Sequence, residues 1–159
     1  MGKHSIIVKR EVSINMNKTL IIIILIFLVI MGTLAGLILA NNARANEIRR
    51  HNRQYEQYVG TEIWGTELAT LINRAVDQNR RNDVELDEYN HFIDNGTNSI
   101  KIEIEMITIE ETFSMERIYH GGMSEFMRGF NFITFKATQI EYHEQTGKVS
   151  RMMFIQLED

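Results

Sequence analysis

The most distinct pattern along the chain is an uninterrupted apolar run from Leu20 to Ala40, which contains no charged residue. As an α-helix these 21 residues span about 31 Å, close to the bilayer core thickness of about 30 Å. Apolar runs in buried helices of soluble proteins are usually shorter, at about 10–14 residues. The run therefore predicts one membrane-spanning helix, with the lipid bilayer as its partner.

The polar sequence that follows, residues 41–59, contains no helix breaker, and Ile48, Tyr55 and Val59 fall near helical spacing. We expect the helix to continue beyond the membrane as a polar stalk until Gly60 marks a joint. The predicted organisation is a basic N-terminal segment (1–19), a transmembrane helix (20–40), a helical stalk (41–59) and a small head domain (60–159).

An amphipathic helix is predicted for residues 61–78. Its apolar residues recur at i, i+4, i+7 and i+8 on one face, and Thr61 is a plausible N-cap. The side chains expected to anchor the core from this face are Trp64, Leu68, Leu71 and Ile72. A tryptophan on the apolar face of a helix is read more simply as a core residue than as a platform for a ligand.

The remainder of the head has β-type patterns. Residues 100–109 alternate apolar and polar positions, with a slip near Met106 that predicts a bulge or bend. Residues 110–130 fit a short helix, a break at Gly121-Gly122 and a second short turn. The runs 132–143 and 148–157 flank a four-residue loop and predict a β-hairpin.

These elements predict the α+β fold class. One amphipathic helix would pack on an antiparallel sheet of two to four strands that ends in the hairpin.

Charge is distributed unevenly along the chain. The formal net charge is −4, but residues 1–18 carry +3 and residues 41–58 carry +2. Residues 59–159 hold 9 basic and 18 acidic side chains, a net charge of −9. Neutralising nucleic-acid phosphates requires clustered Lys and Arg. We therefore expect no nucleic-acid partner for the acidic head.

The same charges leave the orientation in the membrane open, because each flank of the apolar run holds four Lys or Arg residues. Met16 is an alternative start, and it would leave only Lys18 before the run. N-terminal anchors usually keep the amino end inside, which favours an extracytoplasmic head. The rival interpretation is a signal peptide cleaved after Ala45, at Ala43-Arg44-Ala45, although the apolar region of such peptides is normally about 7–15 residues.

Small residues recur every four positions in the second half of the apolar run, at Gly32, Gly36 and Ala40. This spacing lets two membrane helices approach closely and pack by dispersion. It predicts self-association or pairing with another membrane protein through this face.

Catalytic motifs are missing from the sequence. The chain has no cysteine, and its five histidines show no metal-ligand spacing. Nucleophile elbows and phosphate-binding loops are also absent. Only His120, beside Gly121-Gly122, hints at a site, which leaves an anchored hydrolase as a lesser alternative. We expect no cofactor, no metal and no enzymatic activity.

The layout resembles pilin-like proteins, which combine an N-terminal apolar helix, a polar continuation and a small α+β head. The sequence lacks the glycine before the apolar run and the glutamate near its start that type IV pilins have, so prepilin processing is not implied. A second similarity, to small bacterial single-pass membrane proteins, implies no activity. It rests on Asn52, Tyr55, Tyr58, Gly60, Gly65-Thr66, Leu68, Leu71-Ile72 and Asn79.

Together these observations favour a membrane-anchored, non-enzymatic protein of a bacterial envelope. Its acidic head would act as an extracytoplasmic interaction or assembly module. The secreted protein released after Ala45 is the main alternative.

Overall fold

The computed structural model describes residues 3–158, with side chains for residues 18–107 and 109–158. The chain divides into two compact units, Met1–Asn46 and Glu47–Asp159. Helix α1 (Lys3–Glu56) makes up the first unit and enters the second, and residues 47–56 are called the stalk end below. Most side chains of the predicted basic segment, including that of the alternative start Met16, lie outside the side chains that the structure describes.

The first unit confirms the long N-terminal apolar helix. Within Lys18–Glu56 the helix is long and apolar enough to cross a membrane, and its most apolar window is not buried by any other part of the protein. These properties fit a membrane anchor and also fit a signal sequence.

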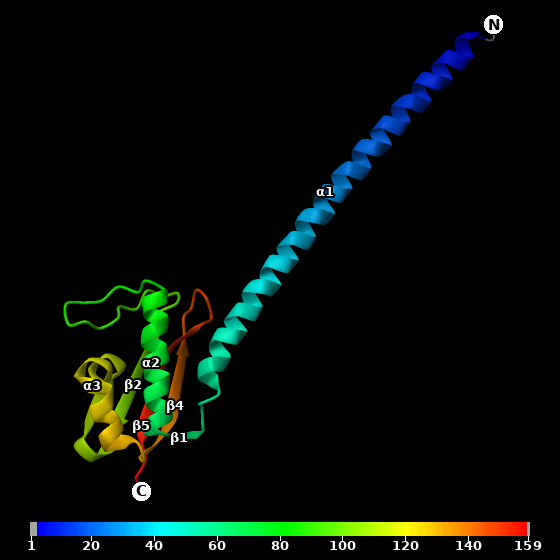
Figure 1. Cartoon of the computed structure of the whole chain (residues 1–159). Helices are drawn as coiled ribbons and strands as arrows, with labels where there is room; N and C mark the ends of the chain where they lie inside the picture. Colours follow the sequence, from blue (N-terminus) through cyan, green and yellow to red (C-terminus); the bar gives the residue numbers. More distant parts are fainter. Residues whose placement is uncertain (1–2, 159) are drawn as a thin grey trace. The chain divides into compact units, whose positions relative to one another are not determined.

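The second unit is built on a five-stranded sheet (Figure 1) with the order β1-β4-β5-β2-β3. The strands are β1 (Glu62–Trp64), β2 (Lys101–Met106), β3 (Glu111–Ser114), β4 (Thr134–Tyr142) and β5 (Val149–Gln156). The predicted C-terminal hairpin is present as β4 and β5. The mixed α+β class fits, but the purely antiparallel sheet is wrong, because β2 pairs with β5 in parallel.

Helices α2 (Gly65–Arg81) and α3 (Met115–Phe130) pack against each other and cover one face of the sheet (Figure 1). Alternate residues of β2, Ile102, Ile104 and Met106, point into the core and are fully buried. Leu68, Leu71 and Ile72 meet them from the sheet-facing side of α2 and are also fully buried. The main core therefore lies between α2 and the central strands.

The predicted role of Trp64 as a core anchor is wrong, because its side chain is 51% exposed. The amphipathic helix begins at Gly65 rather than at Thr61, so Trp64 belongs to β1. Neighbouring residues of a strand point to opposite faces, and β1 directs Ile63 into the core and Trp64 outward. A Cβ atom at Gly65 would lie 1.9 Å from the Phe130 carbonyl oxygen, so this close approach requires glycine.

The segment between β2 and the end of α3 differs in detail from its prediction. The strand expected to reach residue 109 ends at Met106 and is followed by one turn of 3₁₀-helix, Ile107–Ile109. Residues 111–114 then form β3 at the edge of the sheet. The glycine break is a kink within α3, where Gly122 has φ 113° and ψ 99°.

Candidate interaction sites

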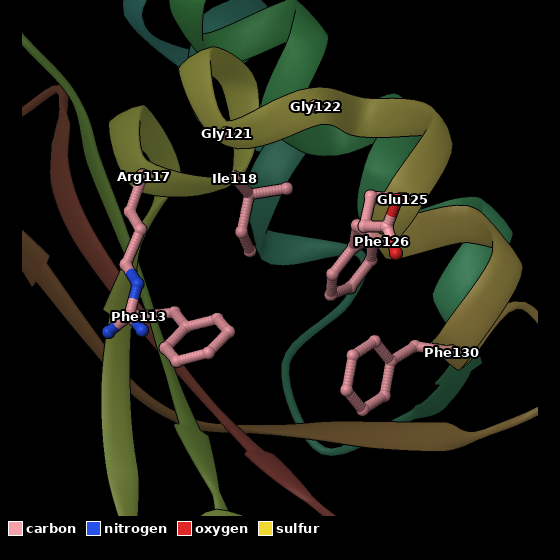
Figure 2. Close-up of a pocket in the computed structure, with 8 residues that line it drawn as sticks. All are labelled: Phe113, Arg117, Ile118, Gly121, Gly122, Glu125, Phe126 and Phe130. Atoms are coloured by element: carbon pink, nitrogen blue, oxygen red, sulfur yellow. The ribbon is translucent and has the colours of Figure 1, made fainter.

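An apolar pocket of about 210 Å³ opens between β3 and α3 (Figure 2). Its walls are formed by Phe113, Arg117, Ile118, Gly121, Gly122, Glu125, Phe126 and Phe130. Pockets that enclose drug-sized molecules usually measure about 300–1,000 Å³. The smaller volume here suits a single apolar side chain of a partner.

Three phenylalanines provide most of the apolar lining, and Figure 2 shows their rings directed into the same space. Phe113 comes from β3, whereas Phe126 and Phe130 follow the Gly122 kink of α3. The rings of Phe126 and Phe130 stack with centroids 5.2 Å apart, and Phe126 also lies 6.2 Å from the ring of Phe135 in the core. The kink therefore gives the second half of α3 a direction that brings its aromatic rings to the pocket.

Charged side chains stand on opposite sides of the pocket (Figure 2). The Arg117 guanidinium lies 3.9 Å from the centroid of the Phe113 ring and pairs with Glu111 at 2.9 Å. On the other side, Glu125 pairs with Arg128. The pocket thus has an apolar floor with one cationic and one anionic side chain at its rim.

Two exposed aromatic residues, Phe132 and Trp64, belong to segments that lie next to Phe130. Phe132, two residues beyond Phe130, is 77% exposed, and Trp64 is 51% exposed. Gly65, which follows Trp64, donates its N–H to the Ile133 carbonyl at 2.9 Å, so the two segments are neighbours. We call this region, with Phe130, Phe132 and Trp64, the aromatic end.

Buried polar side chains hold the opposite part of the head together. Asn52 of the stalk end donates to the Gly147 carbonyl at 2.8 Å and accepts from the Val149 N–H at 3.0 Å. Asn79 of α2 bonds both the N–H and the carbonyl of Ile100, each at 2.8 Å. These two amides satisfy backbone groups at the start of β5 and just before β2. We call this region, with Asn52, Asn79, Ser99 and His143, the polar end.

A serine, a histidine and an aspartate also meet at the polar end, although their spacing along the chain does not predict it. The Ser99 hydroxyl donates to Asp94 at 2.8 Å, and the His143 ring bonds the Ser99 carbonyl oxygen through Nε2 at 2.7 Å. His143 Nδ1 lies 3.6 Å from the Asp94 carboxylate. The Gly96 N–H and the Ser99 hydroxyl hold the pKa of Asp94 below its ordinary value.

This trio lacks the arrangement of a nucleophilic triad. A catalytic histidine must accept the proton of the serine hydroxyl, whereas here that hydroxyl donates to the aspartate instead. The His143 side chain is 2% exposed, so a substrate has no access to it. The trio joins the loop that precedes β2 to the hairpin of β4 and β5, and its role is structural.

The other predicted sites lie apart from these two ends. Gly32, Gly36 and Ala40 are exposed on α1, and a Cβ atom added at either glycine meets no atom within 4 Å. His120 is exposed on α3 and makes an edge-to-face contact with the Tyr119 ring. Among the described side chains it has no carboxylate or hydroxyl partner, so the geometry gives the hydrolase alternative no support.

Residues 18–158, apart from residue 108, contain no group of three or more His, Cys, Asp or Glu side chains placed to hold a metal ion. Comparisons with protein families, curated proteins and solved structures find no match for the chain.

Proposed function

We propose that the protein is a single-pass, membrane-anchored assembly module whose extracytoplasmic head associates with a second copy of the chain without catalysing a reaction. The observation that carries this proposal is the apolar pocket, together with an exposed phenylalanine, Phe132, two residues along the chain from Phe130 of its lining. Soluble monomers rarely leave large aromatic side chains exposed beside an unfilled apolar pocket, and such surfaces mark association sites.

The head favours a two-fold arrangement of two copies. A two-fold axis through the pocket mouth exchanges its two sides, and it would therefore place Arg117 of one copy opposite Glu125 of the other. A surface whose charges complement themselves in this way fits an identical partner better than an unrelated one.

The membrane helix supplies a second contact in this proposal. Gly32, Gly36 and Ala40 form a face without large side chains, on which another helix can pack closely. Anchoring in the same bilayer also confines two copies to a plane, which raises their effective concentration. A modest interaction between heads is then enough for association.

Cysteine cross-linking tests the helix contact directly, because the natural chain contains no cysteine. We expect full-length Gly36→Cys to form disulfide-linked dimers in membranes under mild oxidation. Ile38→Cys is the matched control, since it lies about 200° around the helix from residue 36. Equal cross-linking at both positions, or none at either, would contradict pairing through the glycine face.

The head contact is tested by sedimentation of the full chain in a neutral detergent. Phe132→Ser removes the exposed ring, and Gly121→Trp fills the pocket mouth, where added atoms meet open space. Each change should lower the dimer fraction. The control is Tyr89→Ser, because Tyr89 is 71% exposed but lies outside the pocket. A control that lowers dimerisation as much as Phe132→Ser would overturn the proposed head contact.

The anchor itself has a separate test against the secreted alternative. Amino-terminal sequencing of the mature protein should show that residues 20–40 are retained. A mature chain beginning at Asn46 would show cleavage after Ala45 and contradict the anchor. A topology reporter fused after Asp159 should then be active on the outer side of the membrane, and activity inside would contradict the extracytoplasmic head.

A further inference from the structure

A second cavity, separate from the apolar pocket, lies between the stalk end and α2. It has a volume of about 580 Å³, and its lining is entirely polar or charged. The residues are Gln54, Thr70, Asn73, Arg74, Asp77, Gln78, Arg81 and Asn82. None of them lines the apolar pocket, so this groove is independent of the proposed dimer contact.

Two antiparallel helix segments form the groove. Arg74 donates to the Gln54 carbonyl at 3.5 Å, and further along α2 Gln78 contacts His51 at 3.2 Å. The Tyr55 hydroxyl also donates to Gln78, at 2.8 Å, from a side chain that is fully buried. The walls of the groove are therefore fixed by side-chain contacts behind it.

Four of the nine Lys and Arg side chains of residues 59–159 pair with carboxylates, and the arginines of the groove are not among them. Arg117, Arg128 and Arg151 each pair with a carboxylate, and Lys148 pairs with Glu47. Arg74 and Arg81 make no ion pair with any described residue, although residues 59–159 hold twice as many acidic as basic side chains. Their guanidinium groups therefore remain available to an anion from outside.

The chemistry of the lining indicates the kind of ligand. Guanidinium groups bind phosphate and carboxylate oxygens in a bidentate manner. The side-chain amides of Gln54, Asn73 and Asn82 offer donors and acceptors that suit hydroxyl groups. The lining holds no large apolar side chain of the kind that surface helices insert into a bilayer, which favours a polymer chain over a membrane.

We propose that this groove binds a hydroxyl-rich anionic polymer, whose phosphate or carboxylate groups are held by Arg74 and Arg81. Asp77 lies between the two arginines on the same face of α2 and repels such a ligand. Removing its charge should therefore strengthen binding, whereas removing the arginine charges should weaken it. The same charge changes made away from the groove should have little effect, and this dependence on position distinguishes a specific groove from a general attraction between charges.

The test uses isothermal titration calorimetry of the full chain in a neutral detergent. The probes are alginate oligosaccharides, which carry carboxylates, and oligo(glycerol phosphate), which carries phosphates. We expect at least one to bind, and the tighter of the two identifies the anion. Binding should weaken as salt rises. Dextran provides hydroxyls without charge, poly-glutamate provides charge without hydroxyls, and both should bind at least tenfold more weakly.

Variants then locate the binding site. Arg74→Gln combined with Arg81→Gln should weaken binding roughly tenfold or more, and Asp77→Asn should tighten it roughly two- to fivefold. Arg128→Gln combined with Lys136→Gln is the matched control for the double variant, and Glu105→Gln is the control for Asp77→Asn, because they make the same charge changes away from the groove. The Phe132→Ser variant should bind the polymer with the affinity of the natural chain. The dimer proposal and the groove proposal can therefore fail independently.

Several outcomes would overturn the proposal. These are no binding of either anionic polymer, equal binding of dextran or poly-glutamate, or an effect of the Arg128→Gln/Lys136→Gln control as large as that of the Arg74→Gln/Arg81→Gln variant. Binding to phosphatidylglycerol vesicles that is lost in the double variant, without binding to either polymer, would assign the groove to a membrane surface instead.

Discussion

In most proteins polar side chains are exposed and aromatic side chains are buried. The polar end and the aromatic end of the head depart from this distribution in opposite ways. Asn52, Asn79 and His143 are at most 8% exposed at the polar end, whereas Phe132 is 77% exposed at the aromatic end. Each buried polar group bonds the backbone of a distant segment, which satisfies the requirement that buried donors and acceptors be paired. The exposed ring, by contrast, contributes nothing visible to the fold.

This difference separates the groups that hold the head together from those available for association. Replacing side chains at the polar end should cost stability, and replacing exposed ones at the aromatic end should leave stability nearly unchanged. The chain contains one tryptophan, Trp64, and it lies in the head. Its fluorescence therefore reports unfolding of the head in denaturant without a contribution from the membrane helix.

The largest expected effect is at the polar end. Asn79→Ala removes both hydrogen bonds to Ile100 and leaves its N–H and carbonyl buried without partners. We expect a loss of about 3 kcal/mol in the free energy of unfolding, measured by urea titration. Asn73→Ala, on the exposed side of the same helix, should change it by less than about 0.5 kcal/mol. Similar losses in the two variants would contradict the role of Asn79.

Gly65→Ala tests whether the aromatic end also contains a rigid contact. The added methyl group would overlap the Phe130 carbonyl and force α2 and the end of α3 apart. We expect a loss of about 2 kcal/mol in the free energy of unfolding. Gly129→Ala is the control, since its added atom meets nothing within 4 Å. If Gly65→Ala were as stable as this control, the close approach would be disproved.

The kink of α3 gives a smaller effect. Gly122 has a φ of 113°, which an alanine adopts only with strain, so Gly122→Ala should destabilise the head by about 1 kcal/mol. It should also disturb the pocket and reduce the dimer fraction. Gly121→Ala has no positive φ to maintain and should be neutral or slightly stabilising. Equal stabilities of the Gly122→Ala and Gly121→Ala variants would show that the stability of the head does not depend on the kink.

The smallest effect is a pH dependence at the polar end. Burial lowers the pKa of His51 below its ordinary 6.5. The Val149 backbone opposes this lowering of the pKa, Lys148 and His143 add to it, and Glu47 opposes it more weakly. His51 Nε2 is buried and has no hydrogen-bond partner among the described atoms.

The folded state therefore prefers the neutral imidazole of His51. Its contribution to stability is complete above the ordinary pKa of 6.5 and is lost as the pH falls through the lowered pKa of the folded state. His51→Gln should flatten part of this decline when unfolding is measured at several pH values. His120→Gln, at an exposed site, should leave the slope unchanged. An unaltered slope in His51→Gln would contradict this assignment.

Local sequence patterns were enough to predict the elements whose residues are contiguous. The 3.6-residue period predicted α2 through Leu68, Leu71 and Ile72, and two β-rich runs predicted the hairpin. The parallel pairing of β2 with β5 could not be predicted, because the alternation of apolar and polar residues indicates which face of a strand is buried but not the direction of the neighbouring strand. Trp64 was misassigned because β1 has only three residues, too few to show a period.

The candidate sites were harder to predict for a related reason. Gly121-Gly122 signalled the break beside the pocket, but the pocket also needs Phe113 from a different strand. At the polar end, Asn52 meets Gly147 across 95 positions of sequence, and His143 meets Ser99 across 44. Contacts of this kind depend on the order of strands in the sheet, which the sequence alone did not reveal.

The central place of β5 in the sheet has a consequence for the timing of folding. Residues 149–156 are synthesised after the other four strands, yet they lie between β4 and β2. Until they leave the ribosome the two halves of the sheet have no strand to join them, and the long-range pairing that completes the core cannot begin. The head therefore cannot complete its fold during most of its synthesis. A polypeptide in that state can be threaded through a narrow channel in a membrane.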